Sequence, residues 1–153
     1  MRNCLSSLFI IIISATAFTF GQNTTYDFLR LDMSARAAAL GGSYVTNNDD
    51  VDVIFFNPAG LGFLEKDPIS FSFVKHLMDI NLFSLTYSTS FENIGRFGAG
   101  VQYINYGSFD ETDVNGNITG EFNAGELAFL LSYTNKFMDN FYYGANAKFI
   151  YMK

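Results

Sequence analysis

Two groups of acidic and amide side chains are the first candidates for metal chemistry in this sequence. The first group lies between positions 47 and 52 and consists of Asn47, Asn48, Asp49, Asp50 and Asp52. Its oxygen atoms suit a hard cation such as calcium, but an EF-hand loop also needs a central glycine and a bidentate glutamate, which this stretch lacks. The second group consists of Asp110, Glu111 and Asp113, for which a calcium or lipopolysaccharide-bridging role is conceivable. A solvated turn and a solvated loop explain both groups more simply, so the sequence predicts no metal site and no cofactor.

Residues that could act as nucleophiles or bases do not form a recognisable set. His76 is the only histidine and Cys4 the only cysteine, and no serine occupies a nucleophile elbow. A catalytic triad and a multi-histidine metal site both need partners that these residues do not have. We therefore expect a protein that is not an enzyme.

The first 21 residues have the pattern of a secretory signal peptide. Arg2 supplies the positive start, residues 5–20 form an apolar run, and a small-x-small cleavage site ends the run at Gly21. A membrane anchor is the alternative, but serines and threonines interrupt a run that is already shorter than the ~20 apolar residues of a spanning helix. Cleavage would also remove Cys4, which excludes disulfides and cysteine metal sites from the mature protein.

The charge balance excludes one class of partner. The chain has 9 basic and 15 acidic residues, and loss of Arg2 with the signal peptide leaves a net charge of −7. Because phosphate backbones bind basic surfaces, the sequence predicts no nucleic acid partner.

Beyond Pro68, polar and apolar side chains alternate along five segments. Between Ile94 and Tyr106 the odd positions are apolar and the even positions are polar or small, and the segments at Leu127 and Phe141 repeat this pattern. Alternate side chains of a β-strand point to opposite faces of its sheet, so each strand has one apolar and one polar face. The polar side chains that we expect to line the lumen of a barrel are Arg96, Gln102, Glu126, Asn146 and Lys148.

Three features favour a membrane barrel over a soluble sandwich, in which the apolar face would point inward. A tilted strand that crosses a membrane needs about 9 to 11 residues, which matches these alternations, whereas soluble strands usually have about 5 to 6. Phe and Tyr make the chain 18% aromatic, without tryptophan, and they cluster at strand ends, where interface girdles lie. The export signal is the third feature. We therefore predict an all-β, transmembrane antiparallel barrel in the cell outer membrane, in contact with outer-membrane lipid.

We expect strands at about residues 69–75, 80–91, 94–106, 121–133 and 141–151. The connections at Glu92-Asn93 and at residues 135–140 are short, whereas the segment from Gly107 to Gly120 is long and polar, with Asn115-Gly116 able to form a tight turn at its tip. Barrels of this class place short turns in the periplasm and long loops outside, which puts the N-terminal segment on the periplasmic side.

Five strands cannot close a barrel. An open edge within lipid costs several kcal/mol for each unpaired backbone group. We therefore expect residues 68–153 to be the first strands of an incomplete barrel, so that the chain is an N-terminal fragment.

Residues 22–67 differ in character from the strands. Ser34 can cap a short helix through Leu40, and Gly41-Gly42 supplies the left-handed stop. A weak strand at residues 43–46 and an apolar stretch at residues 51–56 follow.

Asn57-Pro58 fixes a turn and removes one backbone donor, which suits a segment that lies against a wall without joining a sheet. In that interpretation the Asn57 amide bonds to the wall, while Ala59 and Gly60 allow close backbone approach. An ordinary surface turn is the alternative.

Arg36 is the charge of most interest in this segment, because a helix of alanine and leucine gains little from it without a partner. Glu126, Asp49 and Asp52 are the candidate partners. The sequence leaves two outcomes open, which are a buried pair that pins the segment and an arginine at the rim in water.

The sequence SARAAALGG at residues 34–42, the Asp-rich turn, and NPAGL at residues 57–61 together resemble the PorV/PorQ family. These proteins are outer-membrane barrels related to the FadL fatty-acid transporters and occur with the type IX secretion system. GVQYINYGSFD at residues 100–110 and NGNITGEF at residues 115–122 resemble the PorQ branch of that family. The residues that would form the plug motif are Ser34, Arg36, Gly41, Gly42, Asn57, Pro58 and Ala59.

The resemblance implies a FadL-like barrel of about fourteen strands around an N-terminal plug at residues 22–67. It also implies a non-enzymatic component of the type IX secretion system, which helps to hold the cell-surface sortase attachment complex. The Gly-Gly and Asn-Pro-Ala signatures occur across the wider group, so the alternative is a FadL-like transporter of hydrophobic small molecules.

Overall fold

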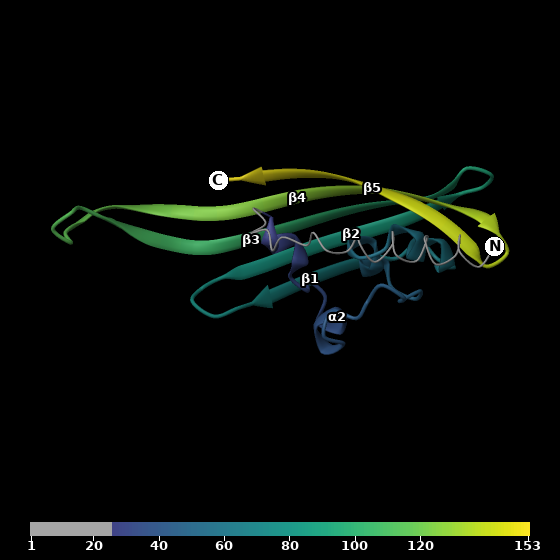
Figure 1. Ribbon diagram of the computed structural model, residues 1–153, viewed down its shortest axis with the longest axis horizontal. Helices are drawn as coiled ribbons and strands as arrows, with labels where there is room; N and C mark the ends of the chain where they lie inside the picture. The colour runs from purple at the N-terminus through teal and green to yellow at the C-terminus, as the bar shows by residue number, and fades with distance from the viewer. Residues whose placement is uncertain (1–25) are drawn as a thin grey trace, which may run out of the picture.

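The computed structural model describes residues 26–153, so the predicted signal peptide and Cys4 lie outside the described residues. Five strands form one antiparallel sheet in the order of the chain (Figure 1). They are β1 (Ile69–Lys75), β2 (Asn81–Phe91), β3 (Gly95–Thr112), β4 (Ile118–Met138) and β5 (Phe141–Met152). The prediction of an all-β fold is confirmed, and each of the five strands predicted beyond Pro68 is present. Neighbours along the chain pair directly, as hairpins joined by short turns require.

Strands β3 and β4 are longer than the sequence pattern predicts. The segment from Gly107 to Gly120 was expected to be a loop, but most of it continues the two strands as a projecting hairpin (Figure 1). That part of the prediction is wrong, because backbone pairing continues where the alternation of side chains stops. A shift in register between Asn105 and Ser108, with a φ of 84° at Gly107, marks a β-bulge at the base of the hairpin.

The tip of this hairpin is the turn that the sequence predicts at Asn115-Gly116. Gly116 has a φ of 84°, a conformation that glycine adopts without strain. The Asp113 carboxylate accepts hydrogen bonds from the backbone amides of Asn115 and Asn117, at 2.8 and 2.9 Å. These hydrogen bonds, together with that from the Asn117 side chain, lower the pKa of Asp113.

The two faces of the sheet differ in chemistry and in exposure. One face is covered by the chain itself, and we call it the inner face; its buried polar side chains are Ser84, Thr86, Ser88, Arg96, Gln102, Ser132 and Thr134. The opposite face, which we call the outer face, carries exposed apolar side chains, among them Ile69, Phe71, Phe73, Phe83, Leu85, Tyr87, Phe97, Phe129, Leu131, Phe149 and Tyr151. The strands therefore alternate as predicted, with the polar side chains covered and the apolar side chains exposed.

Residues 26–67 contain four short helices, which are η1 (Asp27–Arg30), α2 (Ala35–Ala39), η2 (Val51–Phe55) and η3 (Pro58–Phe63). Helix α2 matches the predicted one, with Ser34 as its N-cap, although no side-chain hydrogen bond completes the cap. Gly41 and Gly42 have φ values of 61° and 77°, so the predicted left-handed stop is confirmed. The weak strand predicted at residues 43–46 is absent from the structure, and the apolar stretch that follows is the helix η2.

None of the helices in residues 26–153 is both long and apolar enough to cross a membrane.

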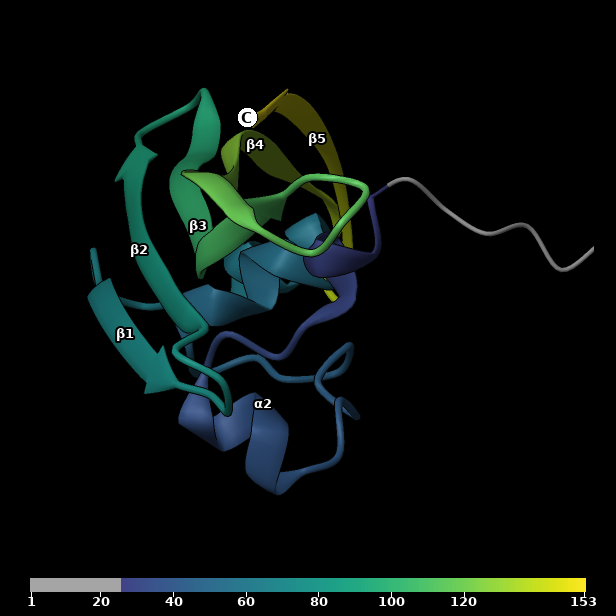
Figure 2. The same cartoon turned by 90° about the vertical axis from the view of Figure 1, so that its left-hand side faces the viewer.

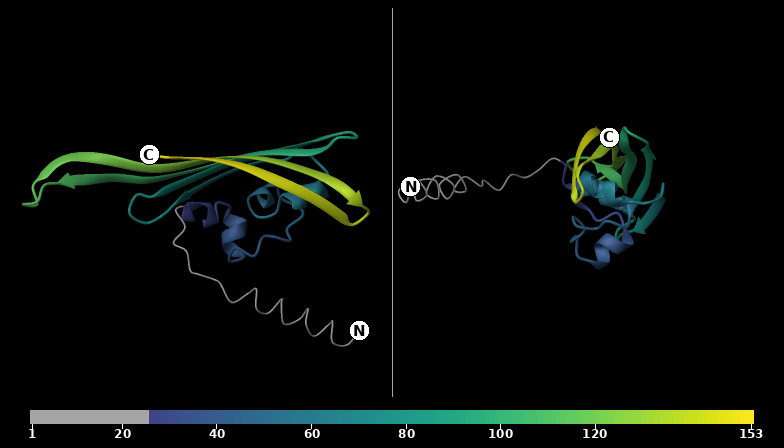
Figure 3. Two further views of the ribbon diagram at one scale, coloured as in Figure 1. Left: turned by 45° about the horizontal axis from the view of Figure 1, so that its top comes forward. Right: turned by 90° about the vertical axis from the view of Figure 1, so that its right-hand side faces the viewer.

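The segment of residues 26–67, which we call the N-terminal segment, packs against the inner face. Figure 2 shows the sheet curving around this segment, and Figure 3 shows that the segment lies on one side of the sheet only. Two apolar clusters join the two parts. The first is formed by Phe28, Met33, Leu82, Ile104 and Ala128, and the second by Val51, Val53, Ile54, Leu61 and Leu130.

Candidate functional site

The contact between the N-terminal segment and the inner face contains most of the buried polar side chains of the described residues, and we take it as the candidate site. It has three polar anchors, which are centred on Arg96, on Asp52 and on Asn146. Each joins a strand to a helix or turn of the N-terminal segment.

The first anchor is Arg96 on β3, whose side chain is only 7% exposed. Its guanidinium donates to the carbonyl oxygens of Leu64 and Lys66, each at 2.8 Å. It also donates to Ser88 Oγ at 3.1 Å and lies 3.4 Å from the half-exposed carboxylate of Asp67. The planar fork of an arginine can reach two carbonyls at once, so Arg96 fixes the point where the N-terminal segment turns into β1.

The second anchor is Asp52 on η2, which is 2% exposed. It accepts hydrogen bonds from Thr86 Oγ1 at 2.7 Å and from Ser70 Oγ at 3.0 Å. These hydroxyls belong to β2 and β1, so one carboxylate ties the segment to two strands. A buried carboxylate is costly unless it is hydrogen-bonded, and here each of its oxygens has a donor.

The third anchor lies on β4 and β5. Asn146 donates from Nδ2 to the carbonyl oxygen of Ile54 at 2.9 Å and accepts from Ser132 Oγ through its own amide oxygen. Next to it, Thr134 Oγ1 donates to the carbonyl oxygen of Pro58. Two strands thus supply donors to one backbone carbonyl of η2 and to one of η3.

A close backbone contact adds to this anchor. A Cβ atom on Gly144 of β5 would lie 2.7 Å from the amide nitrogen of Ala59 and 2.8 Å from the carbonyl carbon of Pro58. Only glycine leaves enough room there, so the start of η3 rests directly on the strand.

The structure corrects one part of the Asn57-Pro58 prediction. Asn57 does not bond to the strands, because its amide donates to the carbonyl oxygen of Val45 and its side-chain oxygen caps η3 by accepting from Ala59 N. The contact with the sheet is made instead by Pro58 and Ala59. The segment therefore lies against a wall of strands without joining them, as the motif predicts, but through its backbone.

Arg36 pairs with Asp49, one of its three predicted partners. Arg36 Nη2 lies 2.9 Å from Asp49 Oδ2, and both side chains are more than half exposed. The hydrogen bond to Asp49 raises the pKa of Arg36 and lowers that of Asp49. Of the two outcomes left open, the structure has the exposed arginine, so this pair does not pin the segment to the strands.

The remaining predicted lumen residues occupy different environments. Gln102 is buried at 4% exposure, and its side chain forms no hydrogen bond with another residue in the described part of the chain. Glu126 is half-buried and accepts a hydrogen bond from the Tyr106 hydroxyl at 3.1 Å. Lys148 is exposed and pairs in register with Leu130.

The acidic residues at positions 47–52 form separate contacts and do not converge on one point. Asp49 pairs with Arg36, Asp52 faces the strands, and Asp50 caps η2 while accepting from the Tyr44 hydroxyl at 2.7 Å. Burial of Tyr44 and its bond to Asp50 raise the pKa of this phenol above its ordinary value. Among residues 26–153, no three His, Cys, Asp or Glu side chains form a group suited to a metal ion.

Sequence reasoning named Asp52 only as a metal ligand or a partner of Arg36, and it missed the role of this residue as an anchor. One signal was available, because Asp52 stands alone among the apolar residues at positions 51–56. A single carboxylate in an apolar helix indicates a buried hydrogen-bonded group. Ser70, Ser88 and Thr134 gave no comparable signal, because a hydroxyl on a polar strand face fits water equally well.

Comparisons of this chain with protein-family models, with curated proteins and with solved structures find no match.

Proposed function

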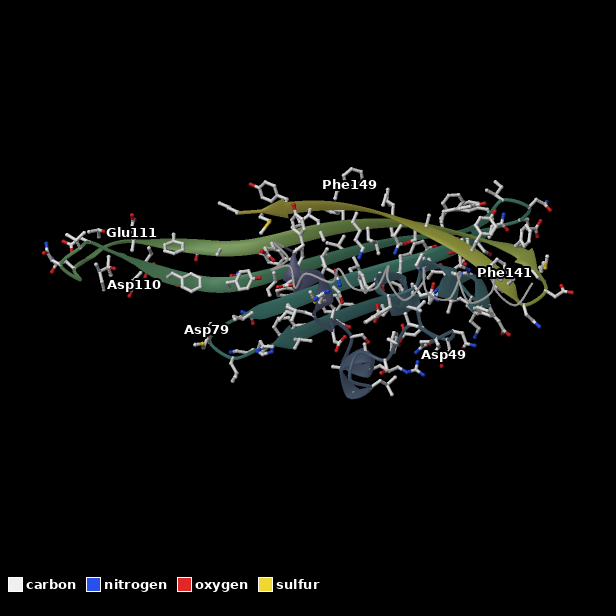
Figure 4. The ribbon with its side chains drawn as sticks, viewed as in Figure 1. Asp49, Asp79, Asp110, Glu111, Phe141 and Phe149 are labelled. Atoms are coloured by element: carbon white, nitrogen blue, oxygen red, sulfur yellow. The ribbon has the colours of Figure 1, made fainter. Side chains whose placement is uncertain are left out.

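We propose that this chain forms strands of an outer-membrane β-barrel, with residues 26–67 as a plug against the inner wall. The observation that carries the proposal is the inverted distribution of side chains over the sheet. Thr86, Ser88 and Thr134 on the inner face are at most 1% exposed, whereas Phe71, Leu131 and Phe149 on the outer face are 57 to 68% exposed. Figure 4 places Phe149 on the side of the sheet away from the N-terminal segment.

This distribution is the reverse of that in a soluble protein of one sheet. Soluble monomers rarely expose a continuous apolar patch larger than a few hundred Å². Here the exposed apolar side chains follow one another across all five strands, and the register places them side by side, as in Phe71 opposite Leu85 and Phe129 opposite Phe149. Lipid is the solvent that suits such a face, since a membrane barrel alternates apolar side chains outward and polar side chains inward.

Aromatic side chains at the turn end of the sheet support the same proposal. Phe91, Phe137, Phe141 and Tyr143 are exposed near the turns that join β2 to β3 and β4 to β5. Phe137 and Phe141 pack edge to face with ring centroids 5.9 Å apart. Rings of this kind form the girdle at a membrane interface.

Within this architecture we assign the chain to the type IX secretion system, as a non-enzymatic barrel that helps to hold the cell-surface attachment complex. The projecting hairpin of β3 and β4 supports this assignment. Phe109 and Phe122 stack with ring centroids 5.4 Å apart and are about half exposed. Asp110 and Glu111 lie beside them on the hairpin (Figure 4), and the sequence has no lysine or arginine between Arg96 and Lys136. An exposed aromatic pair among carboxylates suits a partner that carries basic and apolar groups.

The alternative is a FadL-like transporter of hydrophobic molecules. A transporter needs an open path along its inner wall, whereas the N-terminal segment closes much of the inner face through three polar anchors and two apolar clusters. This closure favours the attachment role over transport.

A deletion strain would test the choice between these functions. In a bacterium with a type IX system, loss of the gene should leave cargo proteins unprocessed or unattached, and the intact gene should restore attachment. A copy with Phe109→Ser and Phe122→Ser should fail to restore it, while a copy with Glu92→Gln at the opposite end of the sheet should succeed. Normal cargo attachment together with impaired uptake of long-chain fatty acids would reverse the assignment.

A further inference from the structure

A cavity of about 400 Å³ lies between the N-terminal segment and strand β3, and its lining includes none of the anchor residues Arg96, Asp52 and Asn146. Its walls come from the chain after η1, from the glycines that end α2 and from the end of η2, and Gln102 of β3 closes it on the strand side. The apolar part of the lining consists of Leu29, Leu31, Met33, Phe55 and Phe56. A volume of this size lies in the range of small-molecule sites, and the lining combines these apolar side chains with polar ones.

Three polar side chains also line the cavity, and none has a partner within residues 26–153. Gln102 is 4% exposed, and its amide forms no hydrogen bond with a described residue. Asp32 and Arg30 likewise form no ion pair with one another or with any other residue that the structure describes. The inner face otherwise satisfies its buried polar groups thoroughly, as Arg96 and Asp52 show. The Gln102 side chain is mostly covered, and its amide is accessible only from the cavity, where a ligand can bond to it.

The positions of the two charges narrow the chemistry of that ligand. Asp32 lies against the backbone of Gly42, where an added Cβ would be 3.4 Å from its carboxylate oxygen. The Asp32 carboxylate therefore lies close to Gly42, which also lines the cavity. Arg30 precedes it by two residues on the same wall and offers a guanidinium, the group best suited to a carboxylate. The wall after η1 thus carries the guanidinium of Arg30 and the carboxylate of Asp32. The rest of the lining includes the Gln102 amide and the rings of Phe55 and Phe56.

We propose that this cavity binds a zwitterionic amino acid or short peptide with an apolar side chain. The carboxylate of the ligand pairs with Arg30, its ammonium group with Asp32, and its carbonyl or amide group bonds to Gln102. The apolar side chain lies against Phe55 and Phe56. The inference rests on the proposed function only in placing the cavity within a barrel lumen.

The test is calorimetric titration of the protein, expressed from its whole gene and folded in detergent, with the dipeptide L-leucyl-L-leucine. Saturable binding at one site is expected, and the N-acetylated, C-amidated dipeptide should bind at least about tenfold more weakly because it lacks both charges. Gln102→Met, which keeps the length of the side chain without its amide, should weaken binding of the dipeptide about tenfold. Arg30 is exposed and Asp32 is half-buried. Arg30→Gln and Asp32→Asn therefore each remove one charge from the cavity without disturbing a buried contact, and each should weaken binding of the dipeptide. Lys136→Gln, at the far turn, is the matched control.

Three results would overturn the inference. They are no saturable binding of the dipeptide, equal binding of the capped dipeptide, and an unchanged affinity in Gln102→Met. Failure of the proposed function is distinguishable from these results. A chain that remains in solution without detergent and still binds the dipeptide would refute the membrane assignment and support the cavity.

Discussion

Replacing Arg96 with methionine should release the N-terminal segment from the sheet. Methionine keeps the apolar stem of the side chain, so the packing around β3 changes little, while every donor of the guanidinium is lost. The carbonyl oxygens of Leu64 and Lys66 then lose their partners at 2.8 Å, and Ser88 loses a neighbour at 3.1 Å.

The expected cost follows from these contacts. A hydrogen bond from a charged donor contributes about 1.5 to 3 kcal/mol, and two such bonds to part-buried carbonyls are lost. The Asp67 carboxylate adds little, because it lies at 3.4 Å and is 47% exposed, so water screens the pair. The segment should therefore be less stable by about 3 to 6 kcal/mol. Arg96→Lys should cost roughly half as much, since one ammonium cannot reach both carbonyls.

Limited proteolysis of the folded chain measures this loss directly. When opening is fast, the rate of cleavage follows the population of the open form, so 3 kcal/mol corresponds to cleavage of residues 26–67 at least about a hundredfold faster. The control is Lys136→Met, which removes only an exposed pair with Asp139 and should leave cleavage unchanged. If Arg96→Met were cleaved within about threefold of the unmodified rate, the anchoring role of Arg96 would be refuted.

Three further changes test other contacts of the segment by the same cleavage assay. Asp52→Ala leaves two strand hydroxyls without an acceptor and should destabilise the segment by about 2 to 3 kcal/mol, whereas Asp52→Asn keeps one acceptor and should cost less; equal effects would contradict the hydrogen-bonding role. Gly144→Val places a Cβ 2.7 Å from the amide nitrogen of Ala59, so it should displace η3, and cleavage at the unmodified rate would show that no close contact exists. Because the pKa of Tyr44 is raised by burial and by Asp50 above its ordinary 10.0, the unfolded chain releases this proton first. Stability should hold below about pH 10 and fall above it, and Tyr44→Phe should remove its part of that fall.

The sheet could be predicted from the sequence because the patterns that define strands and turns lie in residues close together along the chain. Strict alternation from Phe97 to Tyr103 defines which side chains share a face, and the turn at Asn115-Gly116 needs only its own residues. The hairpin beyond Tyr106 could not be predicted in the same way. The alternation is broken by Asp110, Glu111 and Asp113, so this stretch has the sequence pattern of a polar loop. The backbone pairing with β4 nevertheless continues to Thr112.

The candidate site could be predicted only in part, because it is formed by contacts between residues far apart in the sequence. The motif around Asn57-Pro58 predicted a segment lying against strands, yet the partner of Asn57 proved to be Val45 within the same segment. Nothing in the sequence connects Arg96 with Leu64, because a carbonyl acceptor has no side-chain signature. The polar faces could be named in advance, but the pairs across the contact require the fold.

The central claim is that the outer face of the sheet meets lipid, and spin labels along β2 test it most directly. Cys4 is the only cysteine, so single cysteines can be introduced one at a time after its replacement. The protein would be expressed from its whole gene, spin-labelled and inserted into liposomes. Collisions of each label with oxygen, which dissolves in lipid, would be compared with its collisions with a water-soluble nickel complex. Labels at Phe83, Leu85 and Tyr87 should meet oxygen, and labels at Ser84 and Thr86 should be shielded from both reagents. Strong collision of the nickel complex with the labels at Phe83, Leu85 and Tyr87 would mean that this face meets water, and it would contradict the account.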